Sequence, residues 1–231
     1  MTFTNLIKHK YKLALGISLL FHVSAIIGLL FTKYSDFFID NTPLNLIISL
    51  VLLFYTHQKI NKSLWLFFSA CIFAGLTYEI IGINTGFLFG DYEYSTVMGY
   101  KIWGVPILLG NLWFITMYSV GTLTSQTYTW FKVKYNFNVS KDLELHVLAI
   151  TGAFAAVFLD FFLEPVAIKL NFWQWYPLGE IPIYNYVCWF FGSLILQYLF
   201  VNLSFNKQNK FAVYLYAIQL IFFITISFFY K

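Results

Sequence analysis

The run LALGISLLFHVSAIIGLLF, residues 13–31, contains no Asp, Glu, Lys or Arg. A helix that crosses the hydrocarbon core of a bilayer needs about 20 mostly apolar residues, so this run predicts a transmembrane helix. Lysines precede it, as they do in a signal peptide, but the run is long and lacks a small-x-small cleavage site. We therefore predict that it is an uncleaved first span.

The remainder of the chain is equally apolar. Its 231 residues are 60% hydrophobic and only 10% charged, whereas a soluble domain of this length needs far more charged surface. The short alternating segments typical of a transmembrane β-barrel do not occur. We predict an all-α fold, a polytopic membrane helix bundle that forms one integral membrane domain over residues 1–231. The seven predicted spans are residues 11–32, 43–57, 63–83, 104–130, 144–168, 181–203 and 210–230.

Lysines mark one side of this predicted bundle. All 14 basic residues are lysines, and ten of them come before the first span or follow the second, fourth and sixth spans. The other side has Lys33, Lys101, Lys169 and Lys231. Because cytoplasmic loops are enriched in lysine, we predict a cytoplasmic amino terminus. We separately expect the membrane to be a bacterial inner membrane. No basic run is interleaved with aromatic residues, so the net charge of +4 does not indicate a nucleic-acid partner.

Three acids fall inside predicted spans: Glu79, Asp160 and Glu164. A carboxylate in hydrocarbon costs several kcal/mol, so such a residue usually faces a bundle interior and has a function. The alternative for each acid is a hydrogen bond that only packs helices together. Asp160 and Glu164 are four residues apart and share one helix face, and Pro165 predicts a kink or a helix end at Glu164.

The spacing of these acids suggests acid–base chemistry. Two carboxyls that share an apolar site do not ionise together easily, and a carboxylic acid kept protonated is the tool of general-acid catalysis. We therefore predict that all three are catalytic. Other polar residues at similar depth are candidates for substrate binding, although each alone is more often structural: Tyr78, Asn84, Thr85, Asn111 and Asn185.

The aromatic, cysteine and histidine residues indicate which ligands the protein can bind. The chain has 28 Phe, 17 Tyr and 7 Trp, and aromatic walls can hold a conjugated hydrocarbon while their ring faces stabilise a carbocation. Cys71 and Cys188 lie in apolar segments without a CxxC motif, so we expect buried thiols. The four histidines show neither HxxxH nor HxxE spacing, so we expect no metal site.

Four ordered blocks carry a resemblance to a known family. They are GLTYEIIGINTGFLFGDYEY (75–94), GVPILLGNLWFITMY (104–118), LDFFLEP (159–165) and WQWYPLGEIPIYNYVCWF (173–190). Together they resemble the carotenoid biosynthesis membrane family, which includes bacterial carotenoid hydratases and the bacterioruberin-precursor hydratases of haloarchaea. Two positions depart from the family pattern, since Glu164 stands where Asp is expected and Cys188 where glycine is expected.

The resemblance implies a reaction and roles. The family hydrates a terminal isoprenoid double bond to a tertiary alcohol without a redox cofactor. On that basis Asp160 is the first choice for the proton donor. Glu79 and Glu164 are expected to adjust the acidity of that donor or to position the reacting water molecule. Trp113, Tyr118 and Trp189 are expected to line the substrate or stabilise the cation. The expected partners are a carotenoid substrate and membrane lipid, and an association with other carotenoid biosynthesis enzymes stays open.

Two other functions remain open. A small membrane lycopene cyclase uses the same first step, but an internal double bond captures the cation, and its typical Pro-Glu-Glu-like element is missing here. A non-enzymatic carotenoid or lipid binder, or a transporter, would tolerate loss of all three acids. A retinal protein is excluded because the last predicted span has lysine only at its ends.

Overall fold

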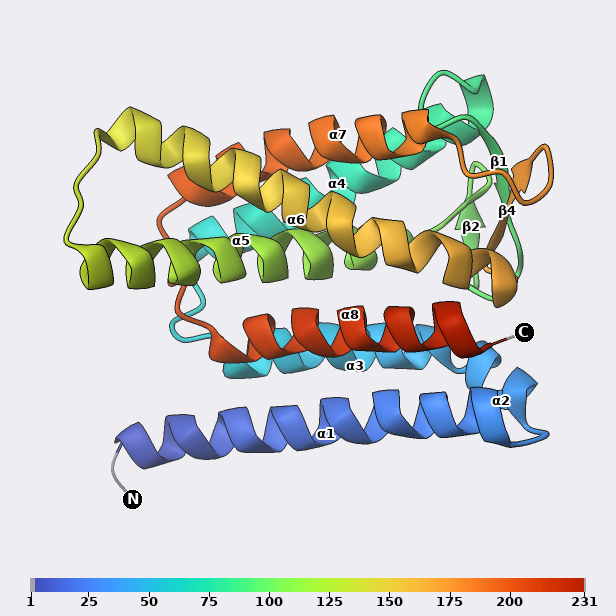
Figure 1. Cartoon of the computed structure of the whole chain (residues 1–231), viewed down its shortest axis with the longest axis horizontal. Coiled ribbons are helices and arrows are strands. Elements are labelled where there is room, and N and C mark those ends of the chain that lie inside the picture. The colour runs from blue at the N-terminus through green and yellow to red at the C-terminus, as the bar shows by residue number, and fades with distance from the viewer. Residues whose placement is uncertain (1–2, 231) are drawn as a thin grey trace.

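The computed structural model describes residues 3–230 and shows a bundle of helices (Figure 1). This confirms the prediction of an all-α bundle. Lys231, which we assigned to the external side, lies outside the described residues. The long helices are α1 (Phe3–Phe31), α3 (Thr42–Thr56), α4 (Lys62–Thr85), α5 (Leu108–Tyr135), α6 (Lys141–Lys169), α7 (Ile183–Asn202) and α8 (Lys210–Phe229), and α2 (Ser35–Asp40) is short.

Each predicted span corresponds to one long helix. Five of these helices, α1, α4, α6, α7 and α8, are long and apolar enough to cross a membrane, so the chain is a membrane protein. Helix α3 has only 15 residues, and α5 does not reach the same hydropathy. The count of seven membrane crossings therefore stays a prediction, as does the orientation of the bundle.

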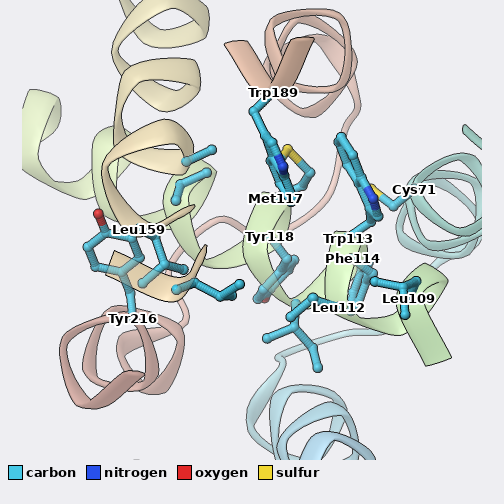
Figure 2. Packing of buried hydrophobic residues seen from close by; sticks show 14 of the residues in the cluster. Cys71, Leu109, Leu112, Trp113, Phe114, Met117, Tyr118, Leu159, Trp189 and Tyr216 are labelled. Carbon is cyan, nitrogen blue, oxygen red and sulfur yellow. The ribbon is translucent and has the colours of Figure 1, made fainter. Parts of the chain in front are cut away.

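Helix α5 forms the centre of the bundle, where it contacts α3, α4, α6, α7 and α8. Nearly every residue from Leu109 to Thr122 is buried. Because other helices surround it, α5 presents little surface to lipid and needs less hydropathy than its neighbours. Figure 2 shows its side chains Leu109, Leu112, Trp113 and Phe114 packed in this core.

The two ends of the bundle differ in construction. The loops that contain most of the lysines meet at one end, where Tyr11 donates to the carbonyl of Gln208 over 3.2 Å and Asn61 donates to that of Ser204 over 2.8 Å. The opposite end holds the long connections between α4 and α5 and between α6 and α7. These connections carry the strands β1 (Asp91–Tyr94), β2 (Lys101–Ile102), β3 (Val105–Pro106) and β4 (Trp173–Tyr176).

Strands β1 and β4 pair antiparallel and cover this end of the bundle. Side chains alternate between the two faces of a strand, so DYEY buries Tyr92 and Tyr94 while WQWY buries Trp173 and Trp175. The register places Tyr94 opposite Trp173 and Tyr92 opposite Trp175. The sheet therefore turns four aromatic side chains toward the ends of the helices.

Helix α6 continues through Pro165 to Lys169. Of the two predicted alternatives, a helix end at Glu164 is therefore wrong, and a kink, for which proline removes one backbone donor, stays a prediction. Because the helix is unbroken here, Asp160 and Glu164 keep their helical spacing and both remain buried.

Candidate active site

The three buried acids lie beneath the β1–β4 sheet. Glu79 lies on the last turns of α4, and Asp160 and Glu164 lie on α6. Their side chains are at most 4% exposed. Carboxyls buried this deeply need hydrogen-bond donors, and the sheet and the neighbouring helices provide them.

Glu79 accepts three hydrogen bonds. Its Oε2 accepts from the hydroxyls of Tyr92 at 2.7 Å and Tyr94 at 2.8 Å, and its Oε1 accepts from the indole N–H of Trp113 at 3.0 Å. Close approach depends on Gly82, where a Cβ would lie only 2.8 Å from the Tyr92 hydroxyl oxygen. Two strand residues and one helix residue thus bind both oxygens of this carboxyl.

Glu164 also accepts three hydrogen bonds, but from different groups. Its Oε2 accepts from the indole N–H groups of Trp173 at 2.9 Å and Trp175 at 2.8 Å. The amide Nδ2 of Asn185 donates to Glu164 Oε1 at 3.3 Å and to Asp160 Oδ2 at 3.1 Å, so it bridges the two acids. Asp160 Oδ1 is buried with no partner among the described residues.

A small hollow separates Glu79 from Glu164. Its volume is about 10 Å³, which is close to the space that one water molecule needs. The lining combines the two carboxyls and one amide with aromatic and aliphatic walls. The lining residues are Glu79, Phe89, Tyr92, Tyr94, Leu109, Leu112, Glu164, Trp173, Trp175, Asn185 and Trp189.

A much larger cavity of about 390 Å³ adjoins this hollow. Leu112 and Trp173 contribute to the walls of both. Its lining is mostly apolar and comes from α1, α2, α3, α6 and α8, and its rim includes the exposed side chains Leu20, Phe37 and Leu44. An apolar molecule that entered this cavity from the side of the bundle would therefore lie against Leu112 and Trp173, which also border the carboxyl hollow.

Two tryptophans form the wall behind Glu79. The rings of Trp113 and Trp189 stack with centroids 4.4 Å apart and an angle of 2° between their planes (Figure 2). Tyr78 meets Trp113 edge to face at 6.0 Å, and its hydroxyl donates to the carbonyl of Cys188. This stack fixes the Trp113 indole that donates to Glu79.

The tyrosine hydroxyls of β1 keep their hydrogens at neutral pH. Burial and the neighbouring Glu79 carboxyl raise the pKa of Tyr92 and that of Tyr94 above the ordinary value. Both groups are therefore available as hydrogen-bond donors to Glu79.

Several residues predicted from the sequence come together here. Glu79, Glu164, Asn185 and Trp189 line the hollow. Trp113 does not line the hollow but donates a hydrogen bond to Glu79, and the ring of Tyr78 packs against that of Trp113. Asp160 does not line the hollow and reaches it only through Asn185.

Other predicted residues lie elsewhere. The side chains of Asn84 and Thr85 are exposed and bond to backbone carbonyls, and Asn111 is half-buried outside the hollow. Tyr118 bonds to His57 at 2.6 Å and to Asn209 at 3.3 Å, near the lysine-rich end. The structure therefore does not bring these four residues to the carboxyls.

The sequence reasoning missed four donors, namely Tyr92, Tyr94, Trp173 and Trp175. Their signal was present, because DYEY and WQWY each alternate aromatic and polar residues with the period of a strand. The two cysteines are free and buried, as predicted. Among the described residues, no three His, Cys, Asp or Glu side chains could hold a metal ion.

The fold and this site define a membrane helix bundle with paired carboxyls beside an apolar cavity. Residues 41–231 match the family model described as "Carotenoid biosynthesis protein". The chain belongs to the carotenoid biosynthesis protein family, and the resemblance seen in its sequence is confirmed. No curated protein and no solved structure gave a significant match.

Proposed function

We propose that the chain is a carotenoid hydratase that adds water across a terminal isoprenoid double bond. The observation that carries this proposal is the hollow between Glu79 and Glu164, which has room for one water and aromatic walls. The family supports a role in carotenoid biosynthesis, and the hollow supports the particular reaction. No redox cofactor is needed, because addition of water changes no overall oxidation state.

Glu79 is the proton donor in this proposal. Its Oε2 is bonded to two hydroxyls, from Tyr92 and Tyr94. A hydroxyl can donate or accept, so one of the two can rotate to accept a hydrogen bond when Oε2 carries a proton. We prefer Glu79 to Asp160, the first choice from the sequence, because a proton donor must reach the reacting atom and Asp160 does not line the hollow.

Glu164 is the acceptor. The indole N–H groups of Trp173 and Trp175 donate but cannot accept, and both point at its Oε2. Asn185 directs a third donor to its Oε1. Glu164 is therefore arranged to receive a proton from water, and Asp160 acts as a positioning residue that orients the bridging amide.

The reaction follows from these roles. The π electrons of the alkene form a C–H bond with the Glu79 proton at the less substituted carbon, which leaves a tertiary cation. The rings of Trp175 and Trp189 face the hollow and can stabilise this charge. The oxygen of water then forms the C–O bond while its proton passes to Glu164. Return of that proton to Glu79 leaves the net addition of one water.

Two alternatives predict different outcomes. A cyclase must keep water away from the cation, whereas this hollow offers a water polar partners on Glu79, Glu164 and Asn185. A carrier or transporter needs no proton donor, so it does not explain why two carboxyls face one small hollow at the end of an apolar cavity.

The test is expression of the chain in a bacterium that accumulates an acyclic carotene, followed by mass analysis of the pigments. We expect a product heavier by one water for each hydrated end. Glu79→Gln and Glu164→Gln should each lower product formation by about 100-fold or more, and Glu180→Gln, an exposed acid in the loop after β4, should leave it unchanged. A product of unchanged mass but altered absorption would indicate cyclisation, and full activity of both glutamine variants would refute the mechanism.

A further inference from the structure

Two buried polar side chains line the large apolar cavity but not the carboxyl hollow. His22 of α1 and Gln219 of α8 are each 5% exposed. The His22 ring meets Phe222 edge to face at 5.7 Å, one helical turn from Gln219, so both polar groups lie in the same region of the cavity. The mechanism proposed above uses neither of them.

The hydrogen bond that His22 already makes determines whether its free ring nitrogen donates or accepts. Its Nδ1 lies 2.8 Å from the carbonyl oxygen of Ser18. A carbonyl only accepts, so Nδ1 must carry the hydrogen, and the Nε2 of the neutral ring presents a lone pair. His22 is therefore an acceptor for a ligand in the cavity.

Gln219 supplies the complementary group. The structure shows no hydrogen bond from its side chain among residues 3–230, and its Oε1 is buried without a partner. Burying an amide without a partner costs about 1–3 kcal/mol, so an unpartnered amide on a cavity wall indicates a polar ligand group. Its oxygen accepts and its N–H group donates, whereas His22 Nε2 only accepts, so the N–H group is the part of the amide that complements His22.

We propose that this cavity binds a linear isoprenoid chain that carries a hydroxyl group, with the hydroxyl held between His22 and Gln219. A hydroxyl donates one hydrogen bond and accepts others, so it matches this pair, whereas a hydrocarbon leaves both groups unpaired. The inference rests on the proposed function only for the isoprenoid nature of the chain. His22 lies outside the residues matched by the family model.

Neither member of this pair lines the carboxyl hollow. Lys169, at the end of α6, bonds to the carbonyl of Ser227 at 2.9 Å, and Gln219 lies eight residues before Ser227. Eight residues of helix span about 12 Å. Asp160 and Glu164 lie nine and five residues before Lys169, about 13.5 and 7.5 Å along α6, so Gln219 lies at a depth between these two carboxyls.

The experiment measures binding on the purified full-length protein in detergent. Tritiated geranylgeraniol is displaced by unlabelled geranylgeraniol, by the hydrocarbon of the same carbon skeleton, and by hexadecanol. We expect the isoprenoid alcohol to compete about tenfold better than its hydrocarbon, which is the effect of one or two buried hydrogen bonds. Equal competition by the two isoprenoids would overturn the inference, and equal competition by hexadecanol would overturn the isoprenoid assignment.

Variants locate the site. Gln219→Leu and His22→Phe keep the shape of each side chain, and each should remove most of the tenfold preference while the hydrocarbon still binds. Ala25→Phe fills the cavity and should abolish binding of both ligands, whereas Val23→Phe on the exposed face of α1 should not. An unchanged preference in both His22→Phe and Gln219→Leu would exclude this pair.

The outcome is independent of catalysis. If the alcohol preference follows these variants but the cells form no hydrated carotene, the proposed function fails and the binding site stands. If the cells form hydrated carotene but the purified protein shows no preference, only the hydroxyl site fails. Retention of the parent's thermal unfolding temperature identifies the variants that are folded.

Discussion

The active-site candidate consists of two halves with the same construction and different chemistry. In each half a carboxyl near the end of one helix accepts two hydrogen bonds from alternate residues of a strand and one from the following helix. Glu79 accepts from Tyr92, Tyr94 and Trp113, and Glu164 accepts from Trp173, Trp175 and Asn185. The strand donors are hydroxyls in one half and indoles in the other.

This difference is the basis of the roles that we propose for the two acids. Hydroxyls can reverse their hydrogen bonds as a proton leaves, whereas indole N–H groups cannot. In the proposed mechanism the tyrosine half can therefore bind its carboxyl in both protonation states, whereas the tryptophan half favours the ionised carboxylate that accepts a proton from water. In the proposed mechanism, two acids of the same residue type thus obtain different roles from the neighbours that each strand provides.

The largest expected effect comes from removing the hydroxyls. Tyr92→Phe with Tyr94→Phe keeps both rings but leaves Glu79 Oε2 without its reversible partners, and we expect hydration to fall by about 100-fold. Product formation per folded protein measures this effect. Activity within twofold of the parent would remove the distinction between the two halves.

Removing a single donor in the other half should lower the hydration rate less. Trp175→Phe removes one donor to Glu164 and leaves Trp173 in place, and loss of one hydrogen bond to a carboxylate is expected to lower the rate by about tenfold. Trp103→Phe, at an exposed position in the β2–β3 turn, is the control. If Trp175→Phe costs more than the double tyrosine change, the assignment of donor and acceptor is reversed.

Alkaline pH tests the tyrosines directly. The pKa of Tyr92 and that of Tyr94 are raised above 10.0 in the folded protein, so the folded state binds more protons than the unfolded state above about pH 10. Their contribution to the free energy of unfolding is present below that pH and decreases as the pH rises. Chemical unfolding at a series of pH values should show a smaller alkaline loss in the Tyr92→Phe/Tyr94→Phe variant than in the parent, and equal losses would contradict the shift.

The smallest effect is expected on the outer face of the same sheet. Glu93 lies between the two tyrosines on β1, points outward and accepts a hydrogen bond from the exposed Tyr176. An exposed interaction of this kind contributes little, so Glu93→Gln should change hydration by less than about twofold. A larger loss would mean that the activity of the site depends on the whole sheet and not only on the side chains of its inner face.

Much of the fold was predictable because the hydrocarbon core sets the length of a span. The third predicted span, 63–83, agrees with α4 within two residues at each end. The fourth was placed at 104–130, but α5 begins at Leu108 because Val105 and Pro106 form a short strand. Apolar composition alone does not distinguish such a strand from the first turn of a helix.

The acids of the site were predictable and their donors were not. A carboxyl in an apolar helix stands out because burying it is costly, which identified Glu79, Asp160 and Glu164. The donors depend on the pairing of β1 with β4, two segments distant in sequence. Tyr118 lies away from the carboxyls because five residues beyond Trp113 is about 7.5 Å along the helix and on a different face.

The order of partners along the chain has a consequence for biosynthesis. Every donor to Glu79 follows it within 34 residues, and every donor to Glu164 follows within 21. As the ribosome releases the polypeptide, each acid therefore meets its partners soon after its own helix enters the lipid. Neither carboxyl needs the other half of the site to form its hydrogen bonds. Pairing of β1 with β4 can then join two units whose carboxyls already have their donors.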